Sequence, residues 1–304
     1  MKFIFFFAFA LLLTISVLAQ APQETKTLPS QTARRFSENW QPDNRPIEPY
    51  QVIGNIYYIG TANISSHIIV TSQGLILLDT GTEEMLPGIQ ANIKMLGYSL
   101  RDVKIILSSH THWDHVGGHA VMKELTGAQV MALGEDATAL VSGIDNSAAG
   151  DSSRKARKPT HVDRVLNDGD EATLGGMTMK ALLTPGHTKG CTTWMTTVQK
   201  NGKSYLVVFL GGTGVNRGVK LLGNTRHPSI IEDYARTFRV LKELHPDVFL
   251  AQHPSLHGMV DKMGRLQAGA AQNPFIDPEG YQRFIREEEV YYLNQLEMEK
   301  SAIR

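Results

Sequence analysis

The sequence contains a single cysteine, Cys191, among 304 residues, and it has no excess of charge of either sign. One cysteine excludes an intrachain disulfide and a zinc site built from several thiolates, so any metal site must use histidine and carboxylate side chains. Thirty basic residues balance thirty acidic ones. This balance excludes a strongly basic nucleic-acid-binding protein and an acidic tail, and we expect no nucleic-acid partner.

Long hydrophobic runs are also scarce, and the prominent one is FIFFFAFALLL from Phe3 to Leu13. It follows a lysine and precedes small residues, which is the pattern of a secretory signal peptide, and it is short for a membrane span. The pattern predicts a signal peptide over residues 1–19 and a polar, flexible leader over residues 20–38. We therefore expect an exported protein, located in the periplasm, without a stable membrane anchor after cleavage.

The remaining residues, 39–304, have the pattern of one α/β domain. Apolar and β-branched runs predict strands at 50–60, 64–71, 75–78, 103–107, 129–132, 164–166, 177–183, 192–198, 204–210 and 248–251. Helical patterns cover 83–96, 118–125, 135–141, 230–244 with a capping box at Ser229 and Glu232, and a last helix from Asp277 towards Leu296. The polar stretch 142–160 predicts a surface loop. This order fits an αββα sandwich of two mixed sheets between outer helices.

Four side chains that can bind a metal ion follow the predicted strand 103–107 within six residues, HTHWDH. Alternate residues of an extended segment point the same way, so His110 and His112 can share one ion. A turn at Trp113 would place Asp114 and His115 at a second position beside it. The alternative, a solvated histidine-rich turn, is disfavoured because the cluster directly follows a buried strand. Neutral imidazole and carboxylate suit zinc, although iron and manganese also accept them.

Two further histidines each follow a predicted strand. His187 comes after a Pro-Gly turn, and His253 comes directly off its strand, with His257 as a rival four residues later. His67 lies in an apolar strand and is predicted to be a buried core histidine. Cys191 is predicted to be a small buried apolar side chain. The remaining histidines are predicted to lie at the surface, namely His119, His161, His227 and His245.

The HxHxDH motif between a strand and a helix resembles the metallo-β-lactamase superfamily, and more narrowly the third subclass of its zinc β-lactamases. The resemblance covers residues 40–300 and includes LILLDTG, TPGHTKGCTTW, LLGN and NPFIDPEGY, of which the last two are characteristic of the subclass. It implies a first zinc site of His110, His112 and His187, and a second of Asp114, His115 and His253. By analogy, Asp79 would orient a ligand histidine.

Other branches of the superfamily differ near residue 212. Glyoxalase-type thioesterases and lactonases have an aspartate that bridges both metals in a segment like FTGDT, whereas this chain has Gly212 in FLGGT. The first β-lactamase subclass has a cysteine ligand in this region, and none is present here. Third-subclass enzymes usually have two serines near the substrate carboxylate, where this chain has Thr213 and Val215. The candidate substrate-binding residues are Thr213, Arg217 and Lys220, and we expect the charge of Arg217 or Lys220 to compensate in part for the missing hydroxyl.

The resemblance implies an exported, zinc-dependent β-lactamase. Two zinc ions would activate a hydroxide that attacks the lactam amide of penicillins, cephalosporins and carbapenems. Asp114 would be both a ligand and the catalytic residue that orients the attacking water. The expected partners are small-molecule β-lactams, and the expected state is a monomer. The alternatives are a lactonase or phosphodiesterase of the same superfamily and a non-catalytic zinc-binding protein.

Overall fold

The computed structural model describes residues 44–148 and 157–303, which fall within one compact unit, Glu38–Arg304. The predicted signal peptide and leader, residues 1–19 and 20–38, lie outside the described residues, as does the centre of the predicted surface loop. In the part of the chain that is described, no helix is both long enough and apolar enough to cross a membrane.

Two sheets form the centre of the domain. Their strands are β1 (Tyr50–Ile53), β2 (Ile56–Tyr58), β3 (His67–Thr71), β4 (Gly74–Leu78), β5 (Val103–Leu107), β6 (Gln129–Leu133), β7 (Arg164–Leu166), β8 (Glu171–Leu174), β9 (Met177–Leu183), β10 (Thr192–Lys200), β11 (Lys203–Leu210) and β12 (Val248–Ala251). Within the described residues, the first sheet has the order β1 to β7 and the second has the order β12-β11-β10-β9-β8. Both sheets are mixed: β4 to β7 run parallel in the first, and β11 pairs in parallel with β12 in the second.

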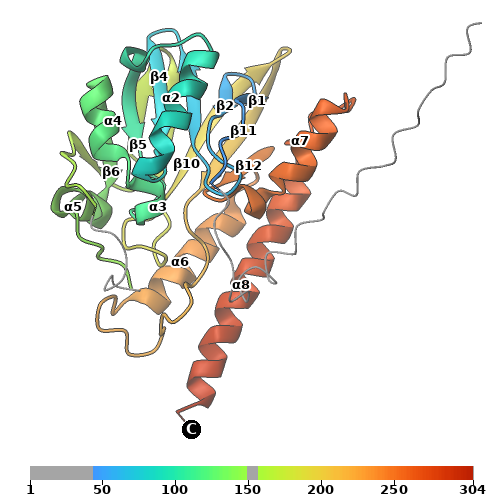
Figure 1. Cartoon of the computed structure of the whole chain (residues 1–304). Coiled ribbons are helices and arrows are strands. Elements are labelled where there is room, and N and C mark those ends of the chain that lie inside the picture. Colours follow the sequence, from blue (N-terminus) through green and yellow to red (C-terminus); the bar gives the residue numbers. More distant parts are fainter. Residues whose placement is uncertain (1–43, 149–156, 304) are drawn as a thin grey trace, which may run out of the picture. The chain divides into compact units, whose positions relative to one another are not determined.

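Helices cover the outer faces of both sheets. They are α2 (Leu86–Met95), α3 (Trp113–Val116), α4 (His119–Thr126), α5 (Gly134–Ser142), α6 (Ile230–Glu243), α7 (Met259–Gln267) and α8 (Pro278–Ser301). Figure 1 shows α2, α4 and α5 on the side of the first sheet, and α6 and α8 on the side of the second. The predicted αββα sandwich is confirmed.

An apolar core lies between the sheets, and its largest fully buried side chain is Trp194. Each such buried apolar side chain contributes about 1.5–3 kcal/mol to the free energy of folding relative to an exposed one. The Trp194 indole Nε1–H also donates a hydrogen bond to the Ser108 carbonyl oxygen at 2.9 Å. The core therefore holds the backbone of β5 in place immediately before the predicted metal-binding motif.

Several local predictions are wrong. The predicted strand 50–60 is a hairpin of β1 and β2, because Gly54 adopts a φ of 53° that favours a turn. The predicted capping box does not form: the Ser229 backbone has a ψ of 13° rather than the extended conformation usual at an N-cap, and its side chain accepts no cap hydrogen bond. Neither β8 nor α7 was predicted. The sequence of α7 has Gly264 in its interior, which weakens a helical pattern.

The histidines outside the motif divide into exposed and buried groups. His161 and His245 are exposed and His67 is buried, as predicted. The surface predictions for His119 and His227 are wrong, because both are fully buried. His227 pairs its Nε2 with the Asp233 carboxylate at 2.7 Å. The prediction that Cys191 is buried is confirmed.

Candidate metal centre

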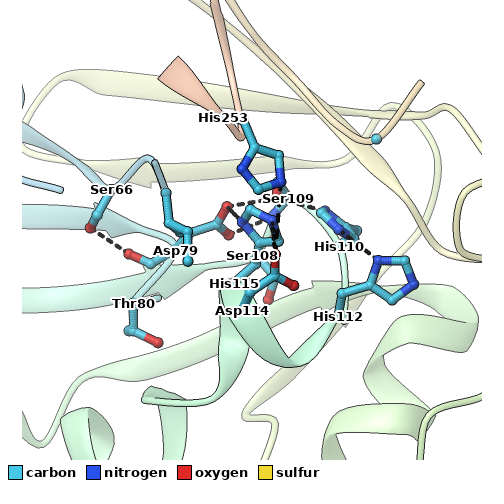
Figure 2. Close-up of polar contacts among 12 residues, drawn as sticks. Ser66, Asp79, Thr80, Ser108, Ser109, His110, His112, Asp114, His115 and His253 are labelled. Carbon is cyan, nitrogen blue, oxygen red and sulfur yellow. Dashed lines mark hydrogen bonds and ion pairs between the residues drawn. The ribbon is translucent and has the colours of Figure 1, made fainter. Parts of the chain in front are cut away.

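The loop after β5 brings four candidate ligands to one edge of the sandwich. His110 and His112 lie in its extended part, and α3 begins directly after them. This single helical turn redirects the chain, so that Asp114 and His115 lie beside the first two histidines rather than in line with them (Figure 2). The predicted turn at Trp113 is therefore a short helix.

The six predicted ligands form two adjoining groups of three. Ligand atoms of His110, His112 and His187 lie within 4.8 Å of one another, and so do those of Asp114, His115 and His253. The ring centroids of His110 and His115 are 4.3 Å apart, which places the groups side by side. His257 lies outside both groups and accepts a hydrogen bond from the Ala251 backbone N–H.

Backbone carbonyls determine the tautomers of the two histidines that come from other loops. His187 Nδ1 lies 2.6 Å from the Gly214 carbonyl oxygen, and His253 Nδ1 lies 2.8 Å from that of Asn63. A carbonyl oxygen only accepts hydrogen bonds, so each Nδ1 must carry the proton. Each Nε2 therefore keeps a lone pair that is available to a metal ion.

A side-chain relay determines the tautomer of His110 in the same way. The Ser109 hydroxyl donates to Asp79 Oδ2 at 2.6 Å, and His110 Nδ1 lies 3.1 Å from the Ser109 oxygen. Because the only hydroxyl proton goes to Asp79, His110 Nδ1–H must be the donor to Ser109. His110 Nε2 is thus left as the ligand atom, and it faces His112 Nδ1 at 3.1 Å.

Asp79 interacts with both ligand groups. Its backbone has a φ of 58°, uncommon for a residue other than glycine, and its carbonyl oxygen accepts the Ser66 hydroxyl (Figure 2). Its Oδ1 accepts the Ser109 backbone N–H at 2.7 Å, while Oδ2 lies 3.5 Å from His115 Nδ1. Asp79 therefore contacts the second group directly and the first through Ser109.

Burial and neighbouring charges set the protonation of the cluster. Burial and the adjacent His115 hold the pKa of His110 well below its usual value, and burial lowers the pKa of His187 to about 4. Burial opposes ionisation of Asp114, but His115 and His253 outweigh it and hold the pKa of Asp114 well below its usual range. The matching raised pKa of His115, about 10 despite burial, comes from Asp114 and Asp79.

The donor set fits zinc. Neutral imidazole nitrogens with one carboxylate are ligands that zinc prefers, whereas calcium and magnesium require mainly oxygen ligands. His115, which is protonated in the metal-free protein, would release its proton on binding an ion. The tautomers place lone pairs of His110, His187 and His253 where an ion would need them. Three protein ligands in each group leave a four-coordinate ion one position for water or substrate.

Comparison with known proteins agrees with this geometry. Residues 59–253 match the model of the metallo-beta-lactamase superfamily. The chain also resembles the native FEZ-1 metallo-beta-lactamase from Legionella gormanii, with 38% sequence identity and a TM-score of 0.82, over 86% of this chain and 99% of that one.

The chain belongs to the metallo-beta-lactamase superfamily. The chain is also similar to BJP-1, a subclass B3 metallo-beta-lactamase of Bradyrhizobium japonicum, with 36% identity and a TM-score of 0.81, over 87% of this chain and 99% of that one. Within the superfamily it therefore belongs to subclass B3.

Curated relatives match this superfamily member over a shorter stretch. A hydroxyacylglutathione hydrolase of Brucella anthropi is 30% identical over 102 residues, which are 34% of this chain and 31% of the relative. A probable metallo-hydrolase of Burkholderia pseudomallei is 32% identical over 95 residues, which are 31% of this chain and 32% of the relative. The chain thus spans about a third of the length of these relatives.

In the segment after β11, the side-chain contacts differ from those predicted for substrate binding. The Thr213 hydroxyl donates to the buried Glu288 carboxylate at 2.9 Å, so its proton is not available to a substrate carboxylate while this bond holds. Val215 packs in the apolar cluster beneath α6 and α8. Arg217 and Lys220 are exposed. Their contact with substrate stays a prediction.

His119 is a supporting residue that the sequence analysis missed. Its Nδ1 lies 2.8 Å from Thr80 Oγ1 and its Nε2 lies 3.2 Å from Ser108 Oγ. His119 therefore links the residue after Asp79 to the residue before Ser109. A signal for its burial was present, because His119 shares one helical face with the buried Met122 and Thr126.

We expect His119 to make the metal-free protein sensitive to acid. Burial lowers its pKa to about 4, while an exposed histidine titrates near 6.5. The unfolded chain therefore takes up the proton first, and the free energy of unfolding falls by up to about 3 kcal/mol as the pH drops from 6.5 to 4. Urea unfolding at pH 7 and pH 4.5 should show a smaller fall for His119→Gln than for the wild type. Equal falls would assign the acid sensitivity to other groups.

Proposed function

We propose that this protein is an exported zinc β-lactamase that hydrolyses the lactam amide of penicillins, cephalosporins and carbapenems. The observation that carries the proposal is the pair of adjoining ligand groups, one of three histidines and one of Asp114, His115 and His253. The likeness to subclass B3 enzymes over nearly their whole length supports it.

Two zinc ions are proposed, one in each group. Bound zinc supplies Lewis acidity, which lowers the pKa of a water molecule towards 7 and polarises a carbonyl group. The residues of the chain hold the ligands in place: the carbonyls of Gly214 and Asn63 orient His187 and His253, and Ser109 orients His110. Asp114 stays ionised, so its carboxylate can orient the attacking water by accepting a hydrogen bond.

A thioesterase with a bridging aspartate is the main competing activity, suggested by the hydroxyacylglutathione hydrolases among the relatives. The geometry at Gly212 argues against it. A Cβ atom at this position would lie 2.1 Å from Cδ2 of the His187 ring, so even the first atom of an aspartate side chain does not fit beside His187. The same argument counts against a lactonase that uses this aspartate. Turnover assays must separate β-lactamase activity from lactonase and phosphodiesterase activity.

The decisive experiment uses zinc-loaded protein that lacks residues 1–19. We expect turnover of a chromogenic cephalosporin and a carbapenem, its abolition by EDTA and its recovery on adding zinc, with no effect of serine-directed inactivators. Acyl-homoserine lactones and bis-nitrophenyl phosphate serve as comparison substrates. Two bound zinc ions with no β-lactam turnover would contradict the proposed substrate while leaving the metal site in place.

Export is a separate part of the proposal and rests on the apolar run 3–13. Expression of the full chain with a tag at its C-terminus, followed by fractionation and mass measurement, tests it. Recovery in the periplasm with a new N-terminus near residue 20 is the expected result. Full-length protein in the cytosol would contradict it.

A further inference from the structure

Asp136 is a buried carboxylate that belongs to neither ligand group. It lies in the first turn of α5 with 1% of its surface exposed. Its Oδ2 accepts the Thr111 backbone N–H at 3.1 Å and the Thr188 hydroxyl at 2.7 Å, and its Oδ1 accepts the Gly190 backbone N–H at 2.8 Å. Burial raises the pKa of Asp136 to about 6 although these bonds lower it, so the group is mainly ionised at pH 7.

The donors to Asp136 lie beside the three histidines of the first group. Thr111 stands between His110 and His112, and Thr188 directly follows His187. The two loops come from different sheets, since one follows β5 and the other follows β9. One carboxylate therefore bonds to both loops that must converge on a single ion.

Close packing at Gly190 shows that this contact is built into the fold. A Cβ atom there would lie 2.5 Å from both the Asp136 backbone nitrogen and the Leu133 carbonyl oxygen. Only glycine allows the loop after His187 to approach the start of α5 so closely. Without the bonds to Asp136, the buried N–H groups of Thr111 and Gly190 would lose their acceptor, which is costly.

We propose that Asp136 is a positioning residue that sets the spacing between the His110–His112 pair and His187, and thereby the affinity of the three-histidine site for its ion. This inference rests on the metal site of the proposed function but not on the substrate. Both carboxylate oxygens are needed, because an asparagine would turn an N–H group towards the N–H of Gly190 or Thr111.

Zinc affinity measured against a chromophoric chelator tests the proposal site by site. The His253→Ala background retains only the three-histidine site, and the His187→Ala background retains only the other. We expect Asp136→Asn to weaken zinc binding about 10–100-fold in the first background and to leave it unchanged in the second. Thr188→Val, which removes one donor, should weaken the same site by about tenfold or less, and Thr188→Ser should restore it.

Asp247→Asn is the matched control, because Asp247 accepts the Leu206 backbone N–H away from the ligand loops. It should leave both zinc affinities unchanged. The proposal is overturned if Asp136→Asn lowers only the melting temperature of the metal-free protein, with both affinities as in the wild type. If Asp136→Asn does not fold, unchanged affinity in Thr188→Val overturns it. These measurements need no β-lactam turnover, so failure of the proposed substrate would not affect them.

Discussion

Asparagine at position 114 is expected to remove the second zinc ion and to lower kcat at least about a hundredfold, with the fold retained. The Asp114 carboxylate lies 3.4 Å from His115 Nε2 and 3.7 Å from His253 Nε2, so it is the negative charge at the centre of that group. An amide of the same shape keeps the packing but offers a neutral and weaker ligand. Zinc content, kcat and the circular dichroism spectrum of Asp114→Asn measure the three effects separately.

Asp261→Asn provides the control for a lost carboxylate. Asp261 is exposed and pairs with the exposed Arg265 one helical turn away, at 3.6 Å. We expect wild-type zinc content and kcat in this variant, because exposed pairs contribute little. Full activity of Asp114→Asn with one bound ion would remove the two-metal proposal.

Gly212→Ala is expected to displace His187 and to disrupt the three-histidine site. The added Cβ would lie 2.1 Å from Cδ2 and 2.3 Å from Cγ of His187, so the ring or the backbone must move. We expect Gly212→Ala to lose zinc from the three-histidine site and to lower kcat by about tenfold or more, because the ligand His187 is displaced. The same strain should lower the free energy of unfolding by about 1–3 kcal/mol.

Gly264→Ala is the matched control for this steric argument. Gly264 lies inside α7 with no atom within 4 Å of the position of a Cβ. This substitution should raise the free energy of unfolding by up to about 1 kcal/mol and leave zinc content unchanged. Unfolding in urea and zinc analysis of both variants test the contrast. Retention of two zinc ions and wild-type stability by Gly212→Ala would contradict the close packing of Gly212 against the His187 ring.

The αββα sandwich and the cluster of six ligands could both be predicted from the sequence, for different physical reasons. Strands such as β5 and β11 end in runs of apolar residues, IIL and YLVVFL, which the local sequence pattern alone reveals. Four of the six ligands lie in one segment, and the other two directly follow strands, so topology alone brings them together. His253 was favoured over His257 for this reason, and the structure places it beside Asp114.

Features that depend on contacts between distant segments could not be predicted. Asp136 stands in the first turn of α5 beside Glu135, and only the packing of this helix against the strand ends buries it. The hydroxyl of Thr213 suggested a substrate contact, but its partner Glu288 comes from α8, far along the chain. Ser229 has the spacing of a capping box, but its backbone does not adopt the extended N-cap conformation, and the local sequence does not reveal this.

The division of the ligands also has a mechanical consequence. Each group combines neighbours from the loop after β5, in the first sheet, with one histidine from the second: His187 follows β9 and His253 follows β12. Each bound ion would therefore link the two sheets, and because the unfolded chain does not hold the ligands together, the free energy of zinc binding would add to the stability of the folded state. The lone cysteine forms no disulfide, so the two bound ions would provide the cross-links between the sheets that disulfides provide in other proteins.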